Sequence, residues 1–207
     1  MTTIYLIRHS KPMKVNNDLN NDSLQIQNEK QILSIEGEKI AKEKLSSSEF
    51  KNIDALYSSN YVRAIQTAKY LSEKYELPIN IYSELGERRF GINTWSELPE
   101  GFERLQIFDE NYKIGDGESQ KEVRERMSKA LTNILNENKG LAVAVVCHGT
   151  AISFLLKNWC TIEFENDKLK YSYKDKVLLH NYFDYCETFK LEFDDNNELI
   201  NIDNIKL

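Results

Sequence analysis

The sequence predicts an α/β fold, a three-layer α/β/α sandwich around a mostly parallel central sheet. Two runs, residues 2–7 and 141–146, consist of apolar, aromatic and β-branched residues, as expected of strands buried on both faces of a parallel sheet. Segments with helical patterns alternate with the strand segments, which is typical of a sheet with helices on both sides. Residues 84–119, which hold five of the eight glycines, are expected to form a small irregular or helical cap.

Both buried strand segments lead into a histidine. The first is followed by Arg8 and His9, and the second runs through a cysteine into His148 and Gly149. Parallel sheets bind ligands at the carboxyl ends of their strands, so these side chains are expected to share one site. The chain contains 3 histidines, and two of them in equivalent places indicate an enzyme.

The segment between the first strand and the first helix is unusually polar. Residues 11–31 are rich in Asn, Asp and Gln and lack apolar periodicity, which predicts either a polar loop beside the site or a disordered surface insertion. A helix is expected from residue 33 to about residue 45. Ser34 is its expected N-cap, and the three serines at 46–48 are expected to end it.

The remaining elements follow from periodicity and capping residues. Polar residues at 58–60 are expected to cap the next helix, whose first turn contains Arg63, and Thr150 is expected to cap the helix after His148. The terminal strands are expected to form a hairpin or a pair of edge strands. The predicted strands are residues 53–57, 78–82, 188–193 and 198–205, and the predicted helices are residues 61–75, 120–136 and 151–159.

Composition excludes several classes of function. At 207 residues, 41% hydrophobic and 29% charged, the chain is expected to form one globular domain over residues 1–207. The net charge of -6 and the scattered basic residues argue against a nucleic-acid partner. We expect a small-molecule partner, held by a local pocket against the overall negative charge. The edge offered by the terminal strands leaves a homodimer as an open alternative.

Cysteine usage and apolar run length bear on location. The three cysteines at 147, 160 and 186 form no CxxC pair, which favours a reducing compartment. No basic stretch followed by a long apolar core opens the chain, so no signal peptide is expected. The apolar runs are too short to span a membrane, and we therefore expect a cytoplasmic protein with no membrane partner.

The candidate site residues suit phosphoryl chemistry. Arg8 and Arg63 offer planar forks that match phosphate oxygens. A neutral His9 imidazole can attack phosphorus through its unshared electron pair, and His148 can donate to a non-bridging oxygen as charge develops. Gly149 allows the backbone to pass close to the ligand.

The same residues also allow interpretations that involve no phosphoryl chemistry. A lone surface arginine is more often an ion-pair partner than a ligand-binding group. His9, His148 and Glu87 form a possible set of metal ligands, but two nearby guanidinium groups would repel the cation. A dyad of Cys147 with His148 is disfavoured, because neighbours on a strand point to opposite faces.

Five motifs, in order along nearly the whole chain, resemble the histidine phosphatase superfamily, also called phosphoglycerate mutase-like. The motifs are Arg8-His9, the Ser-x-x-x-Arg-Ala-x-Gln-Thr-Ala run of residues 59–68, the Leu-Gly-Glu-Arg-Arg-Phe-Gly run of residues 85–91, the Gly-Glu-Ser of residues 117–119 and His148-Gly149.

The resemblance implies a mechanism and the residues that carry it. His9 would be the nucleophile that forms a phosphohistidine, and Arg8, Arg63 and His148 would bind the phosphoryl group. Glu87 would be the general acid for the departing oxygen. No cofactor and no metal are expected, because the arginines and His148 already balance the phosphoryl charge.

Departures from the family pattern leave the substrate open. Ser-Lys-Pro at residues 10–12 replaces the usual Gly-Glu-Thr, and residues 92–97 lack the usual Trp-Glu-Gly. We therefore expect a phosphomonoester hydrolase of unknown substrate. The alternatives are a phosphoglycerate mutase-type enzyme, for which the chain is short, a phosphatase of phosphohistidine in signalling proteins, and a non-catalytic binder of phosphorylated ligands.

Overall fold

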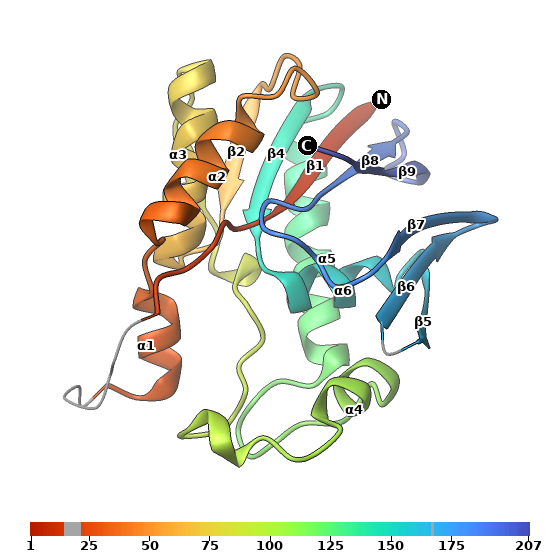
Figure 1. The fold of residues 1–207 in the computed structure, drawn as a ribbon. Helices are drawn as coiled ribbons and strands as arrows, with labels where there is room; N and C mark the ends of the chain where they lie inside the picture. Colours follow the sequence, from red (N-terminus) through yellow and green to blue (C-terminus); the bar gives the residue numbers. More distant parts are fainter. Residues whose placement is uncertain (15–21, 167) are drawn as a thin grey trace.

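A six-stranded sheet in the order β3-β2-β4-β1-β8-β9 forms the centre of the computed structural model, which describes residues 1–14, 22–166 and 168–207 (Figure 1). The first four strands in this order are parallel to one another, and β8 and β9 form an antiparallel hairpin at one edge. The predicted mostly parallel sheet and terminal hairpin are confirmed. The strands are β1 (Thr2–Arg8), β2 (Ala55–Ser58), β3 (Ile79–Ile81), β4 (Ala142–Cys147), β8 (Thr188–Phe193) and β9 (Leu199–Ile205).

Strand β1 lies inside the sheet, where both of its faces are covered. It pairs with β4 in parallel and with β8 in antiparallel orientation. Ile4 and Leu6 pack into one hydrophobic cluster, whereas Tyr5 belongs to a second cluster on the opposite face. Because successive strand residues point to opposite faces, a run without polar residues can occupy only such a doubly covered position.

Two layers of helices cover the two faces (Figure 1). Helices α2 (Ile35–Leu45) and α3 (Val62–Tyr75) pack on the face to which Tyr5 contributes. Helices α5 (Gln120–Glu137) and α6 (Gly149–Leu156) pack on the face of Ile4 and Leu6. The predicted three-layer α/β/α arrangement is therefore confirmed.

The helix caps match the sequence prediction in one case and differ in two. The Ser34 hydroxyl accepts a hydrogen bond from the Gly37 N–H at 2.9 Å, as predicted for the start of α2. Helix α3 has Tyr61 at its N-cap, without a side-chain bond, so the predicted polar cap is wrong. Helix α6 begins at Gly149, which makes His148 the N-cap and places Thr150 in the first turn. In both cases the helix begins at a position where the expected hydroxyl, that of Ser59 or Thr150, lies two residues from the N-cap.

The prediction of a polar loop over residues 11–31 is wrong for residues 24–30, which form helix α1 (Leu24–Lys30). This helix buries no side chain, so it lacks the apolar stripe that identifies helices from sequence. Polar contacts hold it instead, among them the hydrogen bond from the Gln25 amide to the Tyr61 hydroxyl at 2.7 Å. Residues 15–21 of the predicted loop lie outside the described residues.

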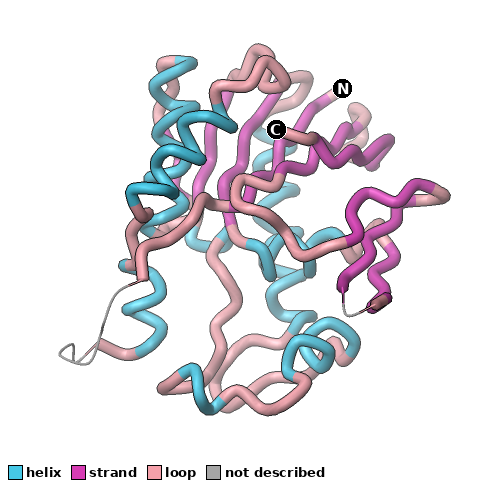
Figure 2. The backbone as a smooth tube through the Cα atoms, in the orientation of Figure 1, coloured by secondary structure: helices cyan, strands magenta, loops and turns pink. Residues whose placement is uncertain are grey.

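A second, three-stranded antiparallel sheet in the order β5-β6-β7 follows α6 and was not expected from the sequence (Figure 2). In β5 and β6 polar residues alternate with apolar or aromatic ones, and Tyr171 is buried against the main core. The aromatic residues of this segment therefore lie on strands that bury one face against the main core. The strands are β5 (Thr161–Glu165), β6 (Lys168–Tyr173) and β7 (Lys176–His180).

The segment at residues 84–119, expected as a cap, is mostly irregular. It contains the end of the 3₁₀ turn η1 (Ser83–Leu85), a second turn η2 (Trp95–Glu97) and the short helix α4 (Phe102–Phe108). The segment lies beyond the carboxyl end of the parallel strands, at the bottom of the view in Figure 1. Among the described helices, none has both the length and the apolar character needed to cross a membrane.

The position of β1 predicts a large difference between two leucine substitutions. Leu6 is 1% exposed, whereas Leu141, which precedes β4, is 39% exposed. Leu6→Ala is expected to lower the free energy of unfolding by about 2–5 kcal/mol, because it leaves a cavity in the core. Leu141→Ala is expected to cost less than about 1 kcal/mol. Urea unfolding of both variants tests this, and equal losses would contradict the burial of β1.

Candidate active site

His9 and His148 lie at the carboxyl ends of two adjacent parallel strands. His9 directly follows β1 and His148 directly follows β4, and their ring centroids are 5.1 Å apart. Both side chains are buried, with 5% and 0% exposure. Strand pairing therefore brings together two residues that are 139 positions apart in sequence (148 − 9), as the sequence predicts.

Arg63 bridges the two imidazoles. Its Nε donates to His9 Nε2 at 3.0 Å, and its Nη2 lies 3.2 Å from His148 Nδ1. The residue is in the first turn of α3, as predicted, and its guanidinium lies 5.0 Å from the Tyr61 ring centroid. Arg63 is 4% exposed, so its charge is held at the base of the site rather than in solvent.

These hydrogen bonds determine the tautomer of each ring. His9 Nδ1 lies 2.7 Å from the carbonyl oxygen of Ser10, which can only accept, so Nδ1 carries the proton. A guanidinium can only donate, and the ring atoms facing Arg63 therefore present unshared electron pairs. In His148 the proton is consequently on Nε2, which lies 2.8 Å from the Ser59 hydroxyl. The His9 atom with the free pair is Nε2.

Both imidazoles are held in the neutral form. Burial lowers the pKa of His9 well below its ordinary value, and the charges of Arg63 and Arg8 lower it further, against a smaller opposing effect of the Ser10 carbonyl. Burial also lowers the pKa of His148, followed by the effect of the Arg63 charge. A neutral imidazole keeps its electron pair at physiological pH, which a nucleophile requires.

Arg8 supplies a second guanidinium close to His148 and its neighbour Gly149. Its Nη1 donates to the carbonyl of Phe183, and its guanidinium carbon lies 5.0 Å from the Tyr185 ring centroid. Its Nε is buried without a hydrogen-bond partner among the described residues. A Cβ atom on Gly149 would lie 3.4 Å from this nitrogen, so glycine keeps the space beside the free donor open.

Glu87 is held against the first turn of α6. Its carboxylate accepts hydrogen bonds from the backbone N–H groups of Thr150 and Ala151, at 3.2 and 3.0 Å. A third N–H, that of Arg88, donates to it at 2.9 Å. The free N–H groups and the positive end of a helix dipole favour an anion at this position.

The Gly-Glu-Ser motif positions the segment that carries Glu87. Arg126 of α5 binds both carboxylate oxygens of Glu118, at 2.8 and 3.0 Å. It also donates to the carbonyls of Glu84, Gly86 and Glu87. Burial alone would raise the pKa of Glu118, but the hydrogen bonds and charge of Arg126 bring that pKa below its usual value. The ionised pair therefore holds the segment next to α6.

The two arginines that follow Glu87 are bonded elsewhere. Arg88 is completely buried, and its donors bind the carbonyl of Glu118 at 2.7 Å and the side-chain oxygen of Gln106 at 2.9 Å. Arg89 is exposed and lies 3.8 Å from the Glu118 carboxylate. Arg88 therefore ties the segment of Glu87 to helix α4 of the cap.

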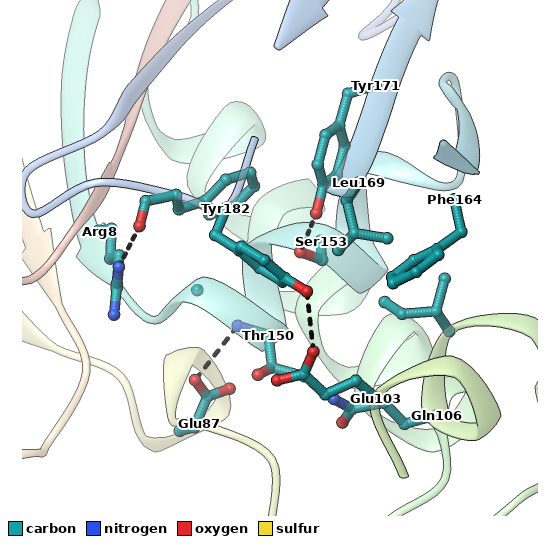
Figure 3. Close-up of a pocket in the computed structure, with 13 residues that line it drawn as sticks. Arg8, Glu87, Glu103, Gln106, Thr150, Ser153, Phe164, Leu169, Tyr171 and Tyr182 are labelled. Atoms are coloured by element: carbon teal, nitrogen blue, oxygen red, sulfur yellow. Dashed lines mark hydrogen bonds between the residues drawn. The ribbon is translucent and has the colours of Figure 1, made fainter. Parts of the chain in front are cut away.

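A cavity of about 260 Å³ adjoins these groups (Figure 3). Arg8, Glu87 and the start of α6 line one side of it, and residues from α4, β5, β6 and the loop after β7 line the rest. His9, Arg63 and His148 are buried and do not line it. The cavity therefore adjoins the site at Arg8, Glu87 and Gly149, while the imidazoles stay enclosed.

The described residues show no group of three His, Cys, Asp or Glu side chains arranged to hold a metal ion. The electron pairs of His9 and His148 that a metal would need face the Arg63 guanidinium instead. The site has the character of an anion site, with two guanidinium groups and the start of a helix.

Comparison with known proteins agrees with this geometry. Residues 4–182 match the family model described as histidine phosphatase superfamily, branch 1. The chain belongs to the histidine phosphatase superfamily. No curated protein matches the sequence significantly.

Several solved structures share the histidine phosphatase fold of this chain. Bacillus stearothermophilus YhfR is 22% identical, with a TM-score of 0.69, over 97% of this chain and 95% of that one. A mycobacterial glucosyl-3-phosphoglycerate phosphatase is 17% identical, with a TM-score of 0.72, over 99% and 98%. A phosphoserine phosphatase from Entamoeba histolytica is 16% identical, with a TM-score of 0.66, over 98% and 97%.

The structure brings together every residue that the sequence placed in the site, and it adds others. Ser59 was expected as part of a helix cap, but its hydroxyl binds His148. Glu103, Gln106 and Tyr182 line the cavity without any sequence signal, since they come from the cap and from a loop after β7. The roles of the predicted residues in catalysis stay predictions.

The lowered pKa of His9 predicts a pH-dependent stability. The unfolded chain takes up a proton at this residue below about pH 6.5, whereas the folded site stays neutral to lower pH. Stability should therefore fall as the pH drops through this range, by about 1.4 kcal/mol per pH unit for one histidine. The pH dependence of urea unfolding should be shallower by that amount in His9→Asn. Parallel curves for the two proteins would contradict a neutral buried His9.

Proposed function

We propose that the protein is a phosphomonoester hydrolase that works through a phosphohistidine at His9. The observation that carries the proposal is the Nε2 electron pair of His9, fixed by the Nδ1 bond to the Ser10 carbonyl and placed against Arg63. A phosphoryl group bound there meets a nucleophile and a buried cation at once. Family membership supports the same chemistry.

In the first step, phosphoryl oxygens replace the imidazoles as acceptors for the N–H groups of Arg63. The Nε2 of His9 attacks phosphorus as the bond to the ester oxygen breaks, and the Arg63 and Arg8 charges stabilise the oxygens. Glu87 takes up a proton when the negatively charged phosphoryl group binds beside it, and it transfers this proton to the departing alkoxide. The free Nε of Arg8 is a donor that needs no rearrangement.

His148 contributes a donor after it takes up a proton. Its Nε2–H stays hydrogen-bonded to the Ser59 hydroxyl, so the added proton is on Nδ1 and faces the phosphoryl group. The negative charge of the bound phosphoryl group favours this protonated form, because it offsets the effect of Arg63.

In the second step, water completes the hydrolysis. The Glu87 carboxylate accepts a proton from water as the water oxygen attacks phosphorus. The bond between phosphorus and Nε2 breaks, its electron pair returns to His9, and inorganic phosphate leaves. This sequence differs from that of a mutase, which returns the phosphoryl group to a bound substrate.

A test of the nucleophile compares wild type with His9→Ala on a panel of phosphomonoesters. Wild type is expected to release inorganic phosphate with and without a chelator and to form a phosphoenzyme that is stable in alkali and labile in acid. His9→Ala is expected to lose both the phosphoenzyme and turnover. Activity abolished by the chelator would favour a metal site. Interconversion of phosphoglycerates without phosphate release would favour a mutase.

A test of the acid compares Glu87→Gln with Glu84→Gln, an exposed glutamate on the same segment. Glu87→Gln is expected to reduce kcat/KM for alkyl phosphates by on the order of 10²–10⁴-fold, because the poor leaving group departs unprotonated. The loss should be much smaller for p-nitrophenyl phosphate, whose leaving group needs no proton. Glu84→Gln should leave both rates unchanged, and equal losses on the two substrates would argue against an acid role.

A further inference from the structure

The leaving-group side of the cavity carries its own pattern of charge. Within the described part of the chain, Arg8 is the only cation that lines the cavity, and it lies at the phosphoryl side. On the opposite side Figure 3 shows Glu103 and Gln106 of α4. Lys157 binds the carbonyl of Ile107 and does not line the cavity. Beyond the phosphoryl site, the ligand therefore meets an anion and no cation.

Glu103 is an exposed residue that lines the cavity, and only one of its carboxylate oxygens has a partner among the described residues. The Tyr182 hydroxyl donates to its Oε2 at 3.1 Å. Its second oxygen, Oε1, accepts no hydrogen bond from the described residues. A ligand group that donates a hydrogen bond can therefore bind there, whereas a carboxylate meets a like charge.

Gln106 adds a donor whose orientation is fixed. Its side-chain oxygen accepts from Arg88 Nη1 at 2.9 Å, which determines which end of the amide is the NH₂ group. Within the residues that the structure describes, that NH₂ group has no acceptor. Glu103 and Gln106 together offer a free acceptor oxygen and a free NH₂ donor group, which the hydroxyl groups of a ligand can satisfy.

The rest of the wall is apolar. Phe164, Leu169 and Phe183 line the cavity, and the nearby hydroxyls of Ser153 and Tyr171 are bonded to each other at 2.8 Å. Arg104 stacks on Phe164, with its guanidinium carbon 4.8 Å from the ring centroid, and does not line the cavity. The wall therefore suits the carbon skeleton of a ligand rather than a second charge.

We infer that the substrate is a phosphomonoester of a neutral polyhydroxyl compound, and that Glu103 selects against leaving groups that carry a carboxylate. The inference rests on the proposed phosphatase function. A hydroxyl of the leaving group donates to Glu103, another accepts from Gln106, and the carbon skeleton packs on the apolar wall.

Two substrates with the same carbon skeleton test the inference. Glycerol 3-phosphate and 3-phosphoglycerate differ only in a hydroxymethyl group against a carboxylate. Wild type is expected to have the higher kcat/KM for glycerol 3-phosphate. Glu103→Lys should lower the ratio of the two kcat/KM values by about tenfold or more, since one repulsion is removed and one attraction is added between partly solvated charges.

Two further variants control the experiment. Glu103→Gln keeps the side-chain volume and should lower the ratio in the same direction by a smaller factor, which covers the case that Glu103→Lys fails to fold. Glu100→Lys makes the same charge change on an exposed cap residue outside the cavity and should leave the ratio within about twofold, because solvent and salt screen the charge.

The outcomes separate the inference from the proposed function. Two results would overturn the inference while the phosphatase function stands. In the first, wild type forms a phosphoenzyme but prefers 3-phosphoglycerate. In the second, Glu103→Lys and Glu103→Gln leave the ratio of the two kcat/KM values unchanged. Failure to turn over either compound or p-nitrophenyl phosphate, with no phosphoenzyme, would overturn the proposed function and the inference with it.

Discussion

The contact of one buried guanidinium with two imidazoles is the constraint on which the site depends. Arg63 donates to Nε2 of His9 and faces Nδ1 of His148, so both rings must present an electron pair to it. Its charge and the burial of the rings lower the pKa of both histidines. The same contact therefore fixes the tautomer, keeps the proposed nucleophile His9 neutral and places a cation beside it.

The cationic site is enclosed in a protein of net charge -6. Burial allows the site to stay locally positive despite this net charge. A charge in a site of low dielectric acts strongly on its neighbours, whereas the surface charges are screened by solvent and salt. Glu87 balances part of the positive potential from its place at the start of α6. The site attracts an anion through local geometry, and the overall charge has little influence on it.

The cap and the sheet are joined through a small number of buried ionic and polar contacts. The pair of Arg126 with Glu118 holds the backbone on both sides of Glu87. Arg88 extends this arrangement to Gln106, which lines the cavity. The proposed catalytic acid, Glu87, and the cavity at Gln106 are therefore positioned by one connected set of bonds, so substitutions in the cap can alter both.

The sequence by itself determined the sheet, its helical layers and the residues at the strand ends, because long apolar runs and helix periodicity are local signals. It also singled out His9, Arg63 and His148 through their places at strand and helix ends, and Glu87 through the resemblance of its motif to the histidine phosphatase superfamily. Only the tertiary structure decided that Arg63 binds both imidazoles and that helix α1 and the second sheet exist. Short, partly exposed elements leave weak periodicity, and hydrogen bonds between distant segments leave no local pattern. For the same reason the cavity lining at Glu103 and Gln106 emerged only from the packing of the cap against the sheet.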